Sequence, residues 1–158
     1  MSNVRPQNMQ RREFVLFADY FRFYIQDESA KGDLSDSWTD EAVARLLAVA
    51  PGAIGLGTVR NMEVHVSVEI HDVEPPLELE VWEHIVECAL EASSGSIVVA
   101  GCTDYLPDAA RIQVAPGAYR VRFSATGLKT LSEDGLPGND RYLLQLWGAS
   151  KIEQSWSR

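Results

Sequence analysis

The pattern of apolar and polar positions predicts that most of this 158-residue chain forms β-strands. The clearest run is 62–71, where Met, Val and Ile occupy every second position. A period of two places these side chains on one face of a strand. Similar runs lie at 13–27, 53–59, 111–114, 119–123 and 142–147. The last of these is apolar at nearly every position, so we expect it to be buried on both faces.

One segment has the spacing of a helix instead. Apolar residues recur three and four positions apart at Val43, Leu46, Leu47 and Ala50. Asp36, Ser37 and Thr39 are all possible N-caps, and acidic residues follow in the first turn. Pro51 and Gly52 end the pattern. We therefore predict one helix of about three turns.

Residues 77–92 fit two structures. Their apolar positions match one face of a helix, and they also match one face of a strand. A Ser-Ser-Gly turn at 93–95 follows, and then the β-rich residues 97–99. A turn between two apolar runs favours a hairpin, so we predict a strand here.

These elements predict a mainly β fold, an antiparallel β-sandwich of about seven or eight strands with one short helix. Strands and helices do not alternate, which disfavours a doubly wound α/β fold. A chain of this length can bury a full core in one domain. We expect a flexible N-terminal tail at 1–12, a single sandwich domain at 13–148 and a C-terminal tail at 149–158.

The charge balance indicates what the chain can bind. There are 23 acidic against 14 basic residues, a formal net charge of −9. Such a surface repels nucleic acid and attracts a basic partner, although acidity also serves solubility. No apolar run approaches the roughly 20 residues of a membrane span, and no secretory signal is evident. We expect a cytoplasmic protein in which Cys88 and Cys102 are reduced and inert, with a redox pair as the alternative.

An acidic loop at 131–140 is the most distinctive local feature. Gly135, Pro137 and Gly138 exclude a helix or sheet interior, and an apolar strand follows directly. The oxygen-rich side chains could bind Ca²⁺, but their spacing differs from the EF-hand pattern. Contact with a basic partner is the favoured role. The candidate partner-binding residues are Glu133, Asp134 and Asp140 in this loop, with Asp36 and Asp40 near the helix start.

The sequence contains no catalytic motif that would define an enzyme. His65 and His71 lie roughly 20 Å apart along one strand, too far to share a metal. Glu69 and His71 could share a metal, with His84 as a third ligand from elsewhere, but nothing in the spacing demands such a site. No Gly-x-Ser-x-Gly motif occurs. We therefore predict no enzymatic activity, no cofactor and no metal site. The alternative is a sandwich that binds a sugar or small molecule, with Ca²⁺ assisting, because the chain has four tryptophans and an oxygen-rich loop.

Several short segments resemble the competence protein J family. They are residues 21–27, residues 37–43 (Ser-Trp-Thr-Asp-Glu-Ala-Val), Gly52-Ala53-Ile54 with Thr58 and Arg60, and residues 116–119. The resemblance runs from about residue 14 to residue 147. It implies a non-enzymatic, mostly β protein, similar to a competence-type nuclease inhibitor or immunity protein. The partner would then be a basic nuclease or toxin. The shared segments are caps, turns and strand anchors, so no inhibitory residue carries over.

Overall fold

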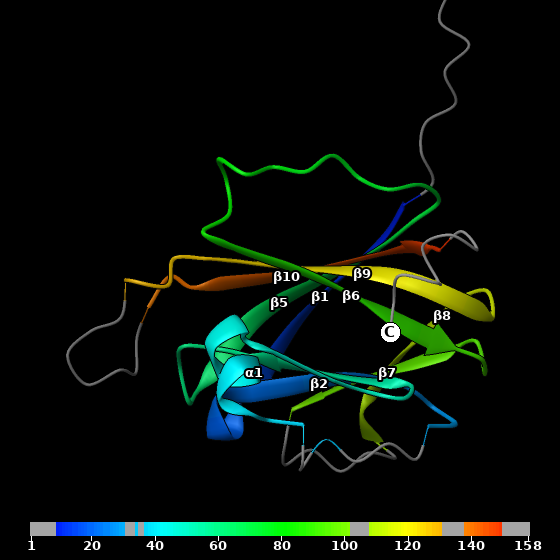
Figure 1. The fold of residues 1–158 in the computed structure, drawn as a ribbon, viewed down its shortest axis with the longest axis horizontal. Coiled ribbons are helices and arrows are strands. Elements are labelled where there is room, and N and C mark those ends of the chain that lie inside the picture. The colour runs from blue at the N-terminus through cyan, green and yellow to red at the C-terminus, as the bar shows by residue number, and fades with distance from the viewer. Residues whose placement is uncertain (1–8, 31–33, 35–36, 102–107, 131–137, 150–158) are drawn as a thin grey trace, which may run out of the picture.

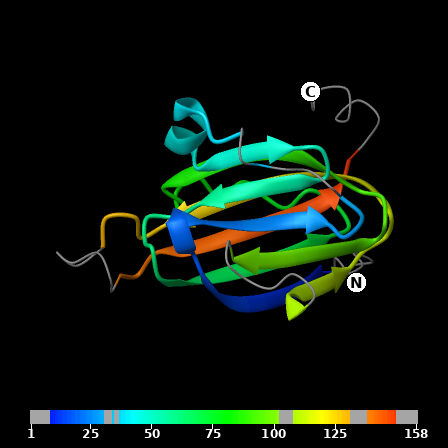
Figure 2. The same cartoon turned by 90° about the horizontal axis from the view of Figure 1, so that it is seen from below.

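Two five-stranded sheets form most of the protein (Figures 1 and 2). The computed structural model describes residues 9–30, 34, 37–101, 108–130 and 138–149. The first sheet has the order β1 (Met9–Phe17), β5 (Glu63–His71), β10 (Arg141–Gly148), β9 (Gly117–Thr126) and β6 (His84–Ala92). The second has the order β3 (Leu47–Ala50), β4 (Ala53–Gly57), β2 (Arg22–Asp27), β7 (Ser96–Gly101) and β8 (Ala110–Gln113).

The buried faces of the two sheets share one hydrophobic core. Phe23 of β2 meets Phe123 of β9 edge to face, with ring centroids 6.2 Å apart. Phe123 stacks on Tyr142 of β10 at 6.0 Å. The period-two alternation of each strand directs these rings inward. The predicted mainly β fold is confirmed, but the described residues form ten strands, more than the seven or eight expected.

Part of the difference in strand number arises in the run at 13–27. The chain breaks there at the short 3₁₀-helix η1 (Asp19–Phe21), where Tyr20 and Phe21 have φ of 59° and 61°. This turn sends β1 into the first sheet and β2 into the second. β1 also begins at Met9 and pairs with β5 up to His71. Strand pairing thus extends into residues 9–12, which we expected to be a tail.

The helix is half as long as predicted. α1 (Asp40–Arg45) begins after Thr39, whose hydroxyl accepts from the Ala42 amide at 3.2 Å. It ends where Leu46 turns into the left-handed region, with φ of 60°. The next residues form β3 and pair with β4. Their backbone bonds to β4 and their burial in the sheet outweigh their helix propensity, which is high for Leu and Ala.

The strand predicted near 77–92 exists, but its pairing differs from the prediction. β6 starts only at His84 and pairs with β9, whereas β7 pairs with β2 and β8. The predicted hairpin is therefore wrong, because the turn at 93–95 leads from one sheet to the other. Sheet membership depends on distant partners that local spacing does not encode.

Residues 72–83, which we call the arm, connect β5 to β6. β5 is parallel to β10, and β6 reaches the same direction through two antiparallel pairings. Parallel strands need a crossover that returns along the sheet. Figure 1 shows this crossover as a green arch on the side of the first sheet that faces away from the second. Among the described residues, no helix is long and apolar enough to cross a membrane.

Candidate functional site

A buried ion pair holds one end of the acidic loop. Asp140 directly precedes β10, and Arg60 lies between β4 and β5. The Arg60 Nε and Asp140 Oδ1 atoms are 2.6 Å apart. The Tyr142 hydroxyl donates to Asp140 Oδ2 at 2.7 Å and accepts from the Val59 amide at 2.9 Å. Charge and hydrogen bonds thus fix the chain where the loop enters β10.

Tyr142 is a neutral hydrogen-bond donor in this network. Its burial raises its pKa above the ordinary value, and the neighbouring Asp140 carboxylate adds to that effect. The phenol therefore remains a neutral donor at physiological pH. Its hydrogen bond to Asp140 supports the position of the loop.

A second group of contacts joins the two sides of the loop. Gly127 has φ of +70°, and a Cβ on it would lie 2.4 Å from the Asn139 carbonyl oxygen. The Thr130 hydroxyl accepts from the Asn139 amide and donates to the Gly127 carbonyl, both at 2.7 Å. Only glycine permits this close approach in this conformation. The segment that carries Glu133 and Asp134 therefore leaves from a closed, well-bonded base.

The structure places the predicted partner-binding residues in different environments. Glu133, Asp134 and Asp36 lie outside the described residues. Asp40 is exposed at the first position of α1, where its charge is favourable for the helix. Asp140 is only 1% exposed, so its carboxylate anchors the loop and does not present charge to solvent. α1 and the base of the loop lie toward the same end of the sheets (Figures 1 and 2).

Sequence reasoning missed the group that anchors the arm. Arg122 of β9 is 2% exposed although it lies on the outer face of the first sheet. Its guanidinium contacts Glu87 at 2.8 Å, Glu74 at 2.9 Å and the Pro75 carbonyl at 2.9 Å. It also lies over the Trp147 ring, 5.0 Å from the ring centroid. The alternation of Arg120 and Arg122 with the core residues of β9 was the available signal that both point outward.

The far end of the arm joins the base of the acidic loop. The Glu83 amide donates to the Ala125 carbonyl at 3.0 Å. The Glu83 carboxylate accepts from the Gly127 amide, also at 3.0 Å. The arm and the acidic loop are therefore attached to the same end of β9. The end of the arm therefore lies beside the base of the acidic loop, whereas the rest of the arm crosses the outer side of the first sheet (Figure 1).

A polar cluster on the outer face of the first sheet is centred on Glu69. Its carboxylate pairs with Arg11, and it accepts from Gln145 at 3.1 Å and contacts His71 Nε2 at 2.8 Å. Burial alone would raise the pKa of Glu69, but the contacts with His71, Gln145 and Arg11 outweigh it and lower the pKa below 4.5. With these partners, the ionised Glu69 carboxylate has a structural role: it links β1, β5 and β10.

The other candidates for chemistry lie apart from one another. His84 Nε2 is 2.6 Å from the Arg45 carbonyl, and His71 is engaged with Glu69. Burial raises the pKa of Cys88 to about 12, so its thiol is a poor nucleophile. Cys102 lies outside the described residues. Within the described ranges, no three His, Cys, Asp or Glu side chains are grouped to hold a metal.

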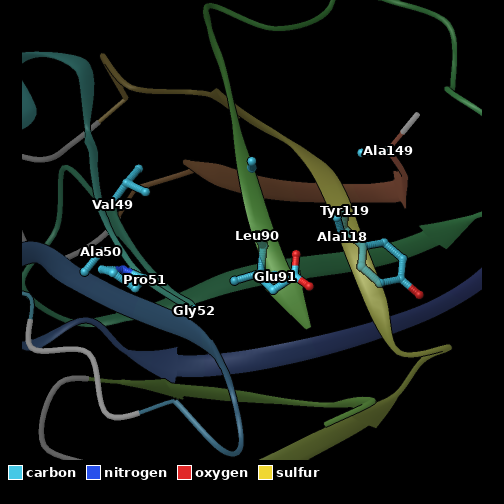
Figure 3. A pocket seen from close by; sticks show the side chains of 10 residues that line it. Val49, Ala50, Pro51, Gly52, Leu90, Glu91, Ala118, Tyr119 and Ala149 are labelled. Carbon is cyan, nitrogen blue, oxygen red and sulfur yellow. The ribbon is translucent and has the colours of Figure 1, made fainter. Parts of the chain in front are cut away.

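One open pocket of about 480 Å³ lies where the β3–β4 turn approaches β6 and β9 (Figure 3). Mostly small apolar side chains line it, together with Glu91 and Tyr119. The Tyr119 hydroxyl already donates to the Ala115 carbonyl at 2.6 Å. Trp147 is buried, and the Trp38 ring packs on Gly55 and beneath the Arg22 guanidinium. These two tryptophans therefore do not form the exposed platform that a sugar site requires.

The described residues thus form a small β-protein of two sheets, with one short α-helix and a polar network at the base of the acidic loop. Two solved structures share this fold. One is ComJ from Bacillus subtilis, an inhibitor of the DNA-degrading activity of NucA; it has a TM-score of 0.67 and 17% identity, over 92% of this chain and all of ComJ. The other is described as crocagin biosynthetic gene J, with a TM-score of 0.63 and 18% identity, over 90% of this chain and 99% of that one.

Comparison of sequences alone does not detect the likeness to these two proteins. No family model matches the chain, and no curated protein matches it in sequence. The predicted resemblance to the competence protein J family is nevertheless confirmed at the level of the fold, over nearly the whole chain. Thr58 and Arg60, two of the residues that suggested it, lie in the network at the base of the acidic loop.

Proposed function

We propose that this chain is a non-enzymatic binding protein that inhibits a basic nuclease, or a toxin with nuclease activity. The observation that carries the proposal is the likeness in fold to ComJ, which covers 92% of this chain. The formal net charge of −9 supports it, because a nuclease must hold a polyanion and its cleft is usually basic. Carboxylates on a preformed scaffold can occupy such a cleft in place of phosphates.

The acidic loop and the start of α1 are the proposed sources of these carboxylates. Glu133, Asp134, Asp36 and Asp40 would contact the partner, whereas Asp140 would hold the loop in position through Arg60. Closure of the loop base reduces the conformational entropy that binding would otherwise cost. Long-range attraction between unlike charges would also speed association at low salt.

The test is a DNA-degradation assay with purified proteins. The probes are the non-specific DNA endonucleases encoded in the genome of the source organism, with NucA of Bacillus subtilis as an additional probe. We expect the chain to abolish the activity of at least one of them at stoichiometric concentration, with weaker inhibition at high salt. Undiminished activity of every nuclease in an excess of the chain would overturn the proposal.

A pair of variants tests the role of the loop in the same assay. Glu133→Gln with Asp134→Asn should weaken inhibition, because the amides keep the side-chain size and lose the charge. Glu63→Gln, on the exposed start of β5, is the matched control and should inhibit like the wild type. Equal inhibition by all three proteins would remove the loop from the proposed interface.

A further inference from the structure

We infer that the arm, residues 72–83, is a docking surface for the same partner, and that it recognises an apolar area flanked by basic side chains. This inference rests on the proposed function and adds a second contact to it. It concerns residues that sequence analysis placed in a strand or left unassigned. Three properties of the arm carry it: exposed apolar side chains, a uniform negative charge and firm attachment at both ends.

The arm exposes several large apolar side chains that lie close together in the sequence. Val73 is 50% exposed, Leu77 50%, Leu79 68% and Val81 53%. Single exposed apolar residues are common, but four of them within nine consecutive positions form a patch. Such patches on soluble proteins commonly mark interaction sites. Burial of these side chains against a partner would remove them from water.

The charge of the arm limits what can cover this patch. Its five acidic residues are Asp72, Glu74, Glu78, Glu80 and Glu83, and it contains no Lys or Arg. A second copy of this chain would bring the same charges together, and like charges across an interface are unfavourable. An anionic membrane surface would be repelled for the same reason. A protein with Lys or Arg around an apolar area is the complementary partner.

The attachment of the arm makes it a preorganised surface. Arg122 holds its first half through Glu74 and the Pro75 carbonyl. Glu83 holds its end through Ala125 and Gly127. Between these anchors, the Val81 amide donates to the Glu78 carbonyl at 3.1 Å and closes a turn. A surface that is already ordered loses little entropy on binding. The exposed residues of the arm can therefore be substituted without disturbing its anchors.

The test measures affinity for the nuclease that the wild-type chain inhibits in the DNA-degradation assay, NucA among the candidates. Leu79→Ser removes the most exposed apolar side chain of the arm, and Val15→Ser removes one of similar exposure, 56%, from β1. We expect Leu79→Ser to weaken binding by about tenfold or more, as truncation of an interface anchor does, and Val15→Ser to have no effect. Circular dichroism and thermal unfolding establish that both variants are folded.

The charge of the arm is tested separately. Glu78→Gln with Glu80→Gln should slow association several-fold at low salt, and the difference should shrink near 0.5 M salt, where the Debye length falls to about 4 Å. Glu63→Gln is the matched control. In the complex, amide hydrogen exchange at 77–82 should be slower than in the free chain. If exchange at 77–82 is equally fast in the complex and Leu79→Ser binds with wild-type affinity, the inference is overturned.

The possible outcomes separate this inference from the proposed function. If the wild type inhibits a nuclease and the arm variants bind equally well, the arm is not the interface and the proposed function stands. If the wild type inhibits no nuclease, both fail. If light scattering shows a wild-type dimer that Leu79→Ser converts to a monomer, a second copy covers the arm and the inference is overturned.

Discussion

Arg60 and Asp140 are buried together, and each replaces much of the water that the other has lost. Their attraction does not make such a pair more stabilising than apolar residues of the same size. Removal of one partner is a different matter, because it leaves the other as an uncompensated buried charge. At this scale, Asp140 therefore matters for the position of the acidic loop, and the charges that could meet a partner lie elsewhere.

The buried pair gives a quantitative prediction. Arg60→Met should lower the free energy of unfolding by about 3–5 kcal/mol, because Asp140 then lacks its counterion. Arg141→Met is the control, because it removes an exposed guanidinium from the residue that follows Asp140. It should change the free energy of unfolding by no more than about 0.5 kcal/mol. Urea denaturation monitored by tryptophan fluorescence measures both. Equal stability of the two variants would show that the pair is not needed.

The titration of Glu69 makes the stability of the folded protein depend on pH. Its pKa is lower in the folded protein than the ordinary value of 4.5, so the ionised carboxylate contributes stability above that pH. The contribution is lost as the pH falls through the folded pKa. Glu69→Gln should therefore be less stable than the wild type at pH 7, and the gap should narrow on acidification below 4.5. Thermal unfolding over this pH range measures the gap, and a constant gap would contradict the assignment.

Among the elements, the strands were the most predictable, since each carries its own period-two pattern. The run predicted at 62–71 matches β5 within one residue, and β10 contains the whole run at 142–147. Partner choice was not predictable. Leu47–Ala50 became a strand because β4 lies beside it, and β6 and β7 joined different sheets. Local spacing does not contain these distant pairings.

The candidate site was predictable only in part, for a similar reason. The sequence singled out the acidic loop, but not which of its carboxylates has a buried partner 80 positions away in Arg60. The arm was missed because residues 77–92 were predicted to be one strand, from the apolar positions on one face and the turn that follows at 93–95. The strand begins only at His84, because the chain before it forms the crossover that two parallel strands require.

The closed base of the acidic loop requires glycine at position 127. Gly127→Ala introduces a Cβ 2.4 Å from the Asn139 carbonyl oxygen at a positive φ. It should cost about 1–3 kcal/mol of unfolding free energy and weaken nuclease inhibition, since the loop must leave its base differently. Gly148→Ala is the control, because its Cβ meets nothing within 4 Å. Identical behaviour of the two variants in denaturation and inhibition assays would argue against a rigid base.

For the molecule as a whole, one end of the arm and the base of the acidic loop meet at the same end of the two-sheet scaffold, and the chain carries a net charge of −9. If the chain inhibits a nuclease as proposed, by occupying the site that DNA needs, then DNA and the chain exclude each other from the nuclease. This claim of mutual exclusion follows directly from the proposed function.

Competition for a catalytically inactivated nuclease tests that claim most directly. Labelled duplex DNA is bound to the inactive nuclease, either NucA or an endonuclease from the source organism, and its fluorescence anisotropy is followed as the chain is added. We predict that the anisotropy falls to the value of free DNA for at least one nuclease, and that Leu79→Ser requires a higher concentration to achieve this. Anisotropy that stays at the bound value for every nuclease, in an excess of the chain, would contradict the proposed function.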